Sequence, residues 1–153
     1  MQHLQNHIVI VTGAASGIGQ QVAIQAAERG GYVIATDINA EGLEITKKAN
    51  RNIEMLILDV SKPDAIIDFA QKIIPTLQGK PLVLINNAGV ALDSGPFINT
   101  TLQDFEWLLS INLWGVIRMT KAFLPYLLET NAGHIVNLSS VFEIGRASGR
   151  ERV

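Results

Sequence analysis

The 153-residue sequence contains no cysteine, which excludes disulfide bonds, zinc–thiolate sites and a cysteine nucleophile. Charged residues make up only 17% of the chain, and 12 Lys and Arg against 14 Asp and Glu give a formal net charge of −2. Without a basic excess, the composition gives no reason to expect nucleic acid or an anionic membrane surface as a partner. We therefore expect a small-molecule ligand.

Long uninterrupted apolar runs are also missing. The first seven residues are polar, where a signal peptide would need a basic and then an apolar segment. The longest apolar stretch, residues 107–128, is interrupted by Ser110, Asn112, Arg118, Lys121 and Pro125. A membrane span does not carry so many polar groups and a proline, so this stretch is interpreted as a helix on a soluble core. We expect a cytoplasmic protein without a membrane partner.

With 48% hydrophobic residues, the chain has enough apolar content for one packed domain. Short β-branched runs predict strands over residues 8–11, 32–36, 53–58, 82–85 and 134–138. Helical spacing predicts helices over residues 17–29, 40–49, 63–77 and 102–129, the last with a possible bend at Pro125. This alternation predicts an α/β fold, a doubly wound parallel sheet with helices on both faces.

A glycine-rich segment, Thr12-Gly-Ala-Ala-Ser-Gly-Ile-Gly19, lies between the first predicted strand and helix. Glycine allows a tight turn and close backbone approach to a pyrophosphate, and a helix N-terminus offers free N–H groups and a partial positive charge. The spacing is Gly-x-x-x-Gly-x-Gly, not the commoner Gly-x-Gly-x-x-Gly. The alternative is a glycine-rich turn without a ligand. The predicted phosphate-binding residues are Thr12, Gly13, Ser16, Gly17, Ile18 and Gly19.

Asp37 follows the second predicted strand, 24 residues after Gly13 (37 − 13). This is close to the spacing of roughly 20 residues expected for a carboxylate that binds the adenosine ribose of NAD. The carboxylate would repel the extra phosphate of NADP, and neither Ser16 nor Ile38 supplies a positive charge for it. The sequence therefore favours NAD over NADP, against the alternative of a solvated aspartate at a strand end.

Further segments, in order along the chain, resemble the short-chain dehydrogenase/reductase family. The glycine segment is similar to that family's Thr-Gly-x-x-x-Gly-x-Gly loop. The other matching segments are Asp59-Val60, Asn86-Asn-Ala-Gly89, Ser110-Ile-Asn112 and Ile135-Val-Asn-Leu-Ser-Ser140. The resemblance implies a Rossmann-type sheet of strand order 3-2-1-4-5-6-7, here truncated after the fifth strand. It also implies cofactor contacts at Asp59, Val60, Asn86, Ala88 and Gly89.

The resemblance implies a hydride transfer between NAD and an alcohol or carbonyl substrate, in a homo-oligomer and without a metal. Asn112 and Ser140 match the catalytic asparagine and serine, with Ser139 as the competing candidate. The alternatives are ordinary structural roles for Asn112 and strand-end capping for the serines. His134 lies at the wrong end of its strand and is interpreted as structural.

The family's catalytic Tyr-x-x-x-Lys step, which would follow Ser140, does not occur in these 153 residues. We therefore expect an active parent enzyme and an inactive, poorly soluble fragment. Trp107 and Trp114 are expected to pack, and Trp107, Leu108 and Phe123 to lose cover with the missing part. The alternatives are a non-catalytic NAD-binding protein on the same fold and a structural fragment without activity.

The last eleven residues change abruptly from apolar to arginine-rich. They resemble the translation of a common sequencing adapter at every position except Gly149. We therefore interpret residues 1–142 as the incomplete NAD-binding domain and residues 143–153 as a non-native tail. The alternative is a genuine basic tail.

Overall fold

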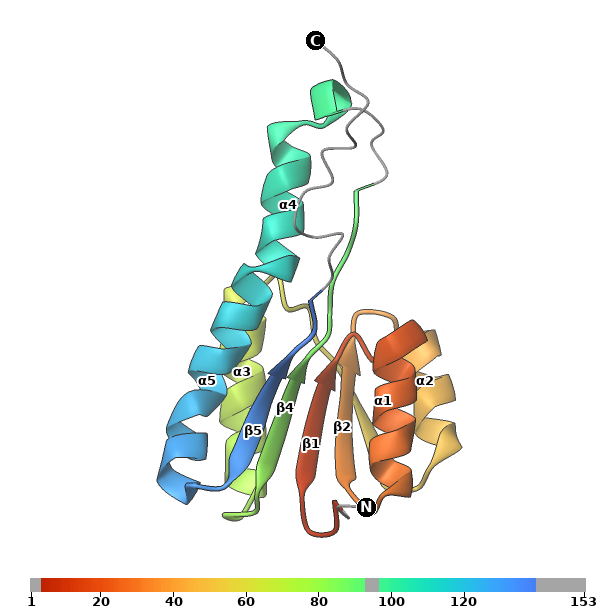
Figure 1. The fold of residues 1–153 in the computed structure, drawn as a ribbon, viewed down its shortest axis with the longest axis vertical. Helices are drawn as coiled ribbons and strands as arrows, with labels where there is room; N and C mark the ends of the chain where they lie inside the picture. Colours follow the sequence, from red (N-terminus) through yellow and green to blue (C-terminus); the bar gives the residue numbers. More distant parts are fainter. Residues whose placement is uncertain (1–3, 93–96, 140–153) are drawn as a thin grey trace.

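The computed structural model describes residues 4–92 and 97–139 (Figure 1). Ser140 and the segment 143–153 lie outside the described residues. The elements are, in chain order, β1 (Ile8–Thr12), α1 (Gly17–Glu28), β2 (Tyr32–Asp37), α2 (Ala40–Ala49), β3 (Ile53–Ile57), α3 (Pro63–Ile73), the 3-10 turn η1 (Ile74–Thr76), β4 (Leu82–Asn86), the 3-10 turn η2 (Phe97–Asn99), α4 (Leu102–Asn112), α5 (Trp114–Thr130) and β5 (Gly133–Asn137).

The five strands form one parallel sheet of order β3-β2-β1-β4-β5. This confirms the α/β fold and the doubly wound parallel sheet expected from the sequence. Because all strands run the same way, their carboxyl ends meet at one edge, the upper edge in Figure 1. Ligands of open α/β sheets bind outside this edge, so it is where a site is to be sought.

Alternating side chains of β1 divide the interior into two cores. Ile8 and Ile10 face the core formed with α3 and α5, and Val9 and Val11 face the core formed with α1 and α2. Figure 1 shows these helix pairs on opposite faces of the sheet. The period of two in a strand makes this division, because successive side chains point to opposite faces.

The long helix expected over residues 102–129 is broken at Leu113, where φ is −111° and ψ is −61°, and not at Pro125, which lies inside α5. The break follows Asn112, whose side chain is bound to the backbone of Val90 in the loop after β4. Just beyond it, Gly115 lies so close to Val60 that an added Cβ would be 3.1 Å from its Cγ2 atom. Tertiary contacts on both sides therefore fix the chain at this point.

The packing expected for Trp107 and Trp114 was partly wrong, and the loss of cover expected for Phe123 was wrong. Trp107 and Trp114 are 49% and 48% exposed, whereas Phe123 is fully buried and packs edge to face on Phe69. Trp107 lies on α4, whereas Trp114 is the first residue of α5, beyond the break at Leu113. Phe123 lies on the face that packs on the core with α3.

Among the described residues, no helix is both long and apolar enough to cross a membrane. The same part of the chain contains no group of three or more His, Asp or Glu side chains that could hold a metal ion.

Candidate functional site

The glycine loop lies at the carboxyl edge of the sheet, between the end of β1 and the start of α1. Gly13 and Gly17 have φ values of +69° and +54°, in the left-handed region that favours glycine. A Cβ added to Gly13 would lie 2.8 Å from the Ala88 Cα atom, whereas a Cβ on Gly17 would meet nothing within 4 Å. Gly13 therefore allows contact between two backbone segments, and Gly17 leaves the entrance to α1 open.

The first turn of α1 presents unpaired donors to solvent. Within residues 4–92 and 97–139, the backbone N–H groups of Ser16, Gly17 and Ile18 have no acceptor, and the Ser16 side chain does not cap the helix. All three residues are exposed. Free N–H groups at the positive end of a helix dipole form a binding site for a phosphate or another anion. Gly19, also predicted here, is buried against the Gly13 carbonyl group.

The half-buried carboxylate of Asp37 adjoins this loop. Its Oδ2 atom accepts a hydrogen bond from the Ala15 N–H group at 3.1 Å, and its Oδ1 atom accepts one from Asn39 N–H at 3.0 Å. An ionised carboxylate offers about four lone-pair sites, so these bonds leave acceptor capacity for ribose hydroxyl groups. The next residue, Ile38, is 69% exposed and carries no charge.

Thr12 joins the loop to the segment after β4. Its hydroxyl oxygen accepts hydrogen bonds from the N–H groups of Asn87 and Ala88, both at 3.0 Å. The Asn87 side chain donates in return to the carbonyl oxygens of Thr12 at 2.9 Å and Gly13 at 3.1 Å. Thr12 is buried, so within the described residues it holds the glycine loop against the segment after β4. Asn87 was not among the predicted site residues, although it is the second residue of the Asn-Asn-Ala-Gly segment that indicated its neighbours.

Asn86 lies beneath this loop and is 3% exposed. Its side-chain amide donates to Asn137 Oδ1 at 2.8 Å and to Thr120 Oγ1 at 3.3 Å, while its own Oδ1 atom has no partner among the described residues. These bonds join the carboxyl ends of β4 and β5 to α5. Gly89, farther along the segment, lies beside Asn112: an added Cβ would be 3.6 Å from its Oδ1 atom.

Asp59 and Val60 follow β3, at the same edge. Asp59 Oδ1 accepts hydrogen bonds from the Ser61 N–H group at 2.9 Å and from the Ser61 hydroxyl group at 2.6 Å. Val60 is buried, in contact with the Gly115 backbone. These two predicted cofactor-contact residues are thus held at the carboxyl edge, Asp59 by a local turn and Val60 by core packing.

The Asn112 side chain makes two hydrogen bonds to the loop after β4. Its Oδ1 atom accepts from the Val90 N–H group at 2.9 Å, and its Nδ2 atom donates to the Val90 carbonyl oxygen at 2.8 Å. Of the two candidate serines, Ser139 is exposed just beyond β5, and Ser140 lies outside the described residues. His134 is exposed at the second residue of β5, away from the carboxyl edge.

Neither tyrosine of the chain lies at this edge. Tyr32 begins β2, and its hydroxyl group donates to Glu54 at 2.6 Å, a bond that raises the pKa of Tyr32 to about 12. Tyr126 donates to the Lys80 carbonyl oxygen, and burial raises its pKa. Both hydroxyl groups lie away from the glycine loop, and their raised pKa favours the protonated form at neutral pH.

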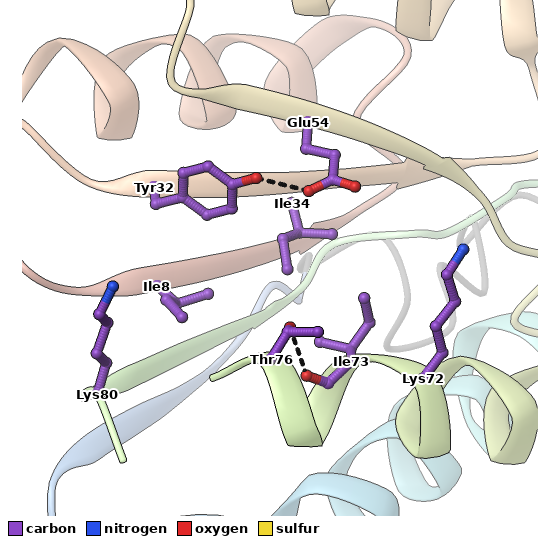
Figure 2. A pocket seen from close by; sticks show the side chains of 8 residues that line it. All are labelled: Ile8, Tyr32, Ile34, Glu54, Lys72, Ile73, Thr76 and Lys80. Carbon is purple, nitrogen blue, oxygen red and sulfur yellow. Dashed lines mark hydrogen bonds between the residues drawn. The ribbon is translucent and has the colours of Figure 1, made fainter. Parts of the chain in front are cut away.

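One cavity lined by described residues lies away from the glycine loop. It has a volume of about 280 Å³ and is shown in Figure 2, with the Tyr32–Glu54 hydrogen bond on the strand side and Ile73 and Thr76 on the helix side. Its strand residues include Ile8 and Tyr32, the first residues of β1 and β2, so it opens near the amino ends of the strands. The predicted site residues that the structure describes lie instead at the carboxyl edge of the sheet. We place the candidate site there, because its free N–H groups and carboxylate have a defined chemistry.

Comparisons with known proteins point to one family. Residues 7–149 match the family model described as short chain dehydrogenase. Curated relatives include a putative oxidoreductase, SadH, of Mycobacterium tuberculosis (30% identical over 154 residues, covering 98% of this chain and 55% of the relative). Retinol dehydrogenase 16 of Mus musculus is 37% identical over 150 residues and is covered to 46%, against 97% of this chain. The chain thus spans about half the length of these relatives.

Solved structures show the same fold. A metagenomic short-chain oxidoreductase in complex with NADP aligns with a TM-score of 0.84 at 29% identity, over 91% of this chain and 64% of that one. Serine dehydrogenase from Escherichia coli aligns with a TM-score of 0.78 at 34% identity, over 87% and 62%. Because the family model matches residues 7–149, which is most of the chain, the chain belongs to the short-chain dehydrogenase family.

Proposed function

We propose that this chain is the cofactor-binding part of an oxidoreductase that transfers a hydride between a nicotinamide dinucleotide, NAD in preference to NADP, and an alcohol or carbonyl substrate. The observation that carries the proposal is the set of exposed, unpartnered N–H groups at Ser16, Gly17 and Ile18, beside the Asp37 carboxylate. The open space at Gly17 leaves room for a phosphate to approach them.

In this proposal the bound dinucleotide supplies the hydride chemistry at its nicotinamide ring. The N–H groups at the start of α1 bind the pyrophosphate, and Asp37 accepts hydrogen bonds from the adenosine ribose. Asp59 and Val60 adjoin the adenine, and the segment Asn86–Gly89 lies along the rest of the cofactor. Asn112 and Ser140, or Ser139 in its place, belong to the catalytic group by their resemblance to the family.

For these 153 residues themselves we propose cofactor binding without turnover. The residues four positions after Tyr32 and Tyr126 are Thr36 and Thr130, so no Tyr-x-x-x-Lys step is present to supply an acid/base group. A relative from Salmonella typhi, 38% identical, is called an NADP-dependent 3-hydroxy acid dehydrogenase, so the family fold also serves NADP.

We further propose that the parent protein is a homo-oligomer and that α5 contributes to its interface. Four large apolar residues follow one another on α5 at spacings of three, seven and four, which puts them on one face. They are between 36% and 71% exposed, and we call them the α5 stripe: Trp114, Ile117, Leu124 and Leu128.

The test is a calorimetric titration of the chain with NAD and with NADP, repeated with Asp37→Ser. We expect the wild-type chain to bind NAD more tightly by roughly 5- to 150-fold, since couplings of this kind are worth about 1–3 kcal/mol. Asp37→Ser should reduce this preference by weakening NAD binding and relieving repulsion of the NADP phosphate. Asp68→Ser, which changes an exposed aspartate on α3, is the matched control. Equal or tighter NADP binding by the wild-type chain would contradict the preference, and binding of neither would contradict the function.

A further inference from the structure

The backbone of Ala14 and Ala15, in the middle of the glycine loop, is completely hydrogen-bonded within the protein. The Ala14 N–H group donates to the Thr36 carbonyl oxygen at 3.0 Å, and the Ala15 N–H group donates to Asp37 Oδ2 at 3.1 Å. Both alanines are buried. Their N–H groups therefore hold the loop against the end of β2 and are not free for a ligand.

Two side chains from outside the loop hold the carbonyl groups of the same residues. The Thr46 hydroxyl group, on α2, lies 2.8 Å from the Ala14 carbonyl oxygen and 3.1 Å from the Gly42 carbonyl oxygen of its own helix, so the Ala14 oxygen is the nearer acceptor. The Gln20 amide group, on α1, lies 3.2 Å from the Ala15 carbonyl oxygen. The Gln20 amide also donates to Thr46 Oγ1 at 3.0 Å. Thr46 is fully buried. The two side chains thus form one connected pair behind the loop.

A close approach of α2 makes this arrangement possible. Gly42 lies one turn before Thr46, on the same face of the helix. A Cβ added to Gly42 would lie 2.6 Å from the Ala15 carbonyl oxygen and 2.8 Å from the Ala15 Cβ atom. Any larger residue at this position would push the helix away from the loop, and Thr46 with it.

The geometry of the peptide bond connects these carbonyl groups to the candidate site. In a trans peptide the C=O group and the following N–H group point in opposite directions. Gln20 binds the Ala15 carbonyl oxygen and so turns the Ser16 N–H group away from itself, to the exposed side. Thr46 binds the Ala14 carbonyl oxygen and in the same way directs the Ala15 N–H group to Asp37.

We propose that Thr46 and Gln20 are positioning residues for the cofactor: without touching it, they fix the two peptide planes that present the Ser16 N–H group to the phosphate and hold Asp37 beside the loop. The inference rests on the proposed function for the identity of the ligand. The orientation of the loop is a separate claim that can be measured without any ligand.

The test compares Thr46→Val and Gln20→Leu with the wild-type chain. The dissociation constant for NAD is measured by calorimetry, the melting temperature by circular dichroism, and amide hydrogen exchange residue by residue in the free protein. We expect the Kd to rise about tenfold for Thr46→Val, the effect of one lost hydrogen bond of about 1.4 kcal/mol. Exchange should accelerate at the Ala15 N–H group. Thr46→Ser keeps the hydroxyl group and should restore both values.

Thr130→Val is the matched control, because the Thr130 hydroxyl group also bonds to a backbone carbonyl, that of Tyr126 at 2.9 Å, at the far end of α5. It should change the melting temperature and leave the Kd unchanged. An unchanged Kd in both Thr46→Val and Gln20→Leu would overturn the inference. If the wild-type chain binds no NAD, the proposed function fails, and hydrogen exchange alone tests the orientation of the loop. Faster exchange at the Ala15 N–H group in Thr46→Val then supports this orientation, and unchanged exchange overturns it.

Discussion

Gly13 and Gly17 have almost the same left-handed backbone conformation but different surroundings. The sequence predicts both for one reason, the need for a tight turn before a helix. The structure separates them, since only Gly13 faces another backbone segment, at Ala88. The contacts of Asn87 and Thr46 could not be predicted in this way. Thr46 lies 32 residues from the carbonyl group that it binds, and local pattern contains no information on such a pairing.

The two glycines should respond differently to the same substitution. Gly17→Ala places a methyl group in open space, so its stability cost is limited to left-handed strain of about 1–2 kcal/mol. The methyl group should nevertheless weaken NAD binding, because it occupies space at the unpartnered N–H groups. Gly13→Ala should cost more stability, since the strain is joined by a collision with the backbone of Ala88. Urea unfolding and NAD titration of both variants test this. Equal stability losses would show that the surroundings of the two glycines do not matter.

At the scale of elements, the strands could be predicted closely because short β-branched runs between turns have few other interpretations. The expected strand over residues 134–138 is found one residue earlier, at Gly133–Asn137, and the helix expected to end at residue 77 ends at Ile73 in a 3-10 turn. Helix and strand ends depend on capping and tertiary contacts. The break at Leu113 was not foreseen for the same reason, as it depends on the distant Val90.

The attachment of α4 to the loop after β4 can be tested at Asn112. Asn112→Leu removes both hydrogen bonds to Val90 and leaves its N–H and C=O groups without these partners. We expect a loss of about 1–3 kcal/mol in the free energy of unfolding, the sum of two ordinary hydrogen bonds. Ser110→Ala, on the same helix, removes only a local bond to the Trp107 carbonyl oxygen and should have a smaller effect. Similar urea midpoints for the two variants would mean that the Val90 contact contributes little.

At the scale of the whole molecule, β5 is an edge strand of the sheet. The β5 strand is mostly exposed, Val136 to 43%, and among the described residues no strand pairs with its outer edge. The α5 stripe adds a row of exposed apolar side chains on the helix that packs beside β5. Unpaired strand edges and apolar patches both favour association with other chains.

We therefore expect the 153-residue chain to self-associate at micromolar concentration. Sedimentation velocity should show oligomers for the wild-type chain. Leu128→Lys, which places a charge in the α5 stripe, should shift the distribution toward the monomer. Ile45→Lys introduces the same charge at an isolated, similarly exposed position on α2 and should leave it unchanged. A monomeric wild-type chain would show that neither the β5 edge nor the α5 stripe drives self-association. Equal effects of both variants would indicate a general effect of charge.

The central claim is the location of cofactor binding at the glycine loop, and the most direct measurement is residue-resolved amide hydrogen exchange with and without saturating NAD. We predict that protection increases at Ser16, Gly17 and Ile18, whose N–H groups have no acceptor among the described residues of the free chain. Residues around the cavity near Tyr32 and Lys80 should show no change. Protection confined to that cavity, or unchanged exchange at the start of α1 under saturating NAD, would contradict the account.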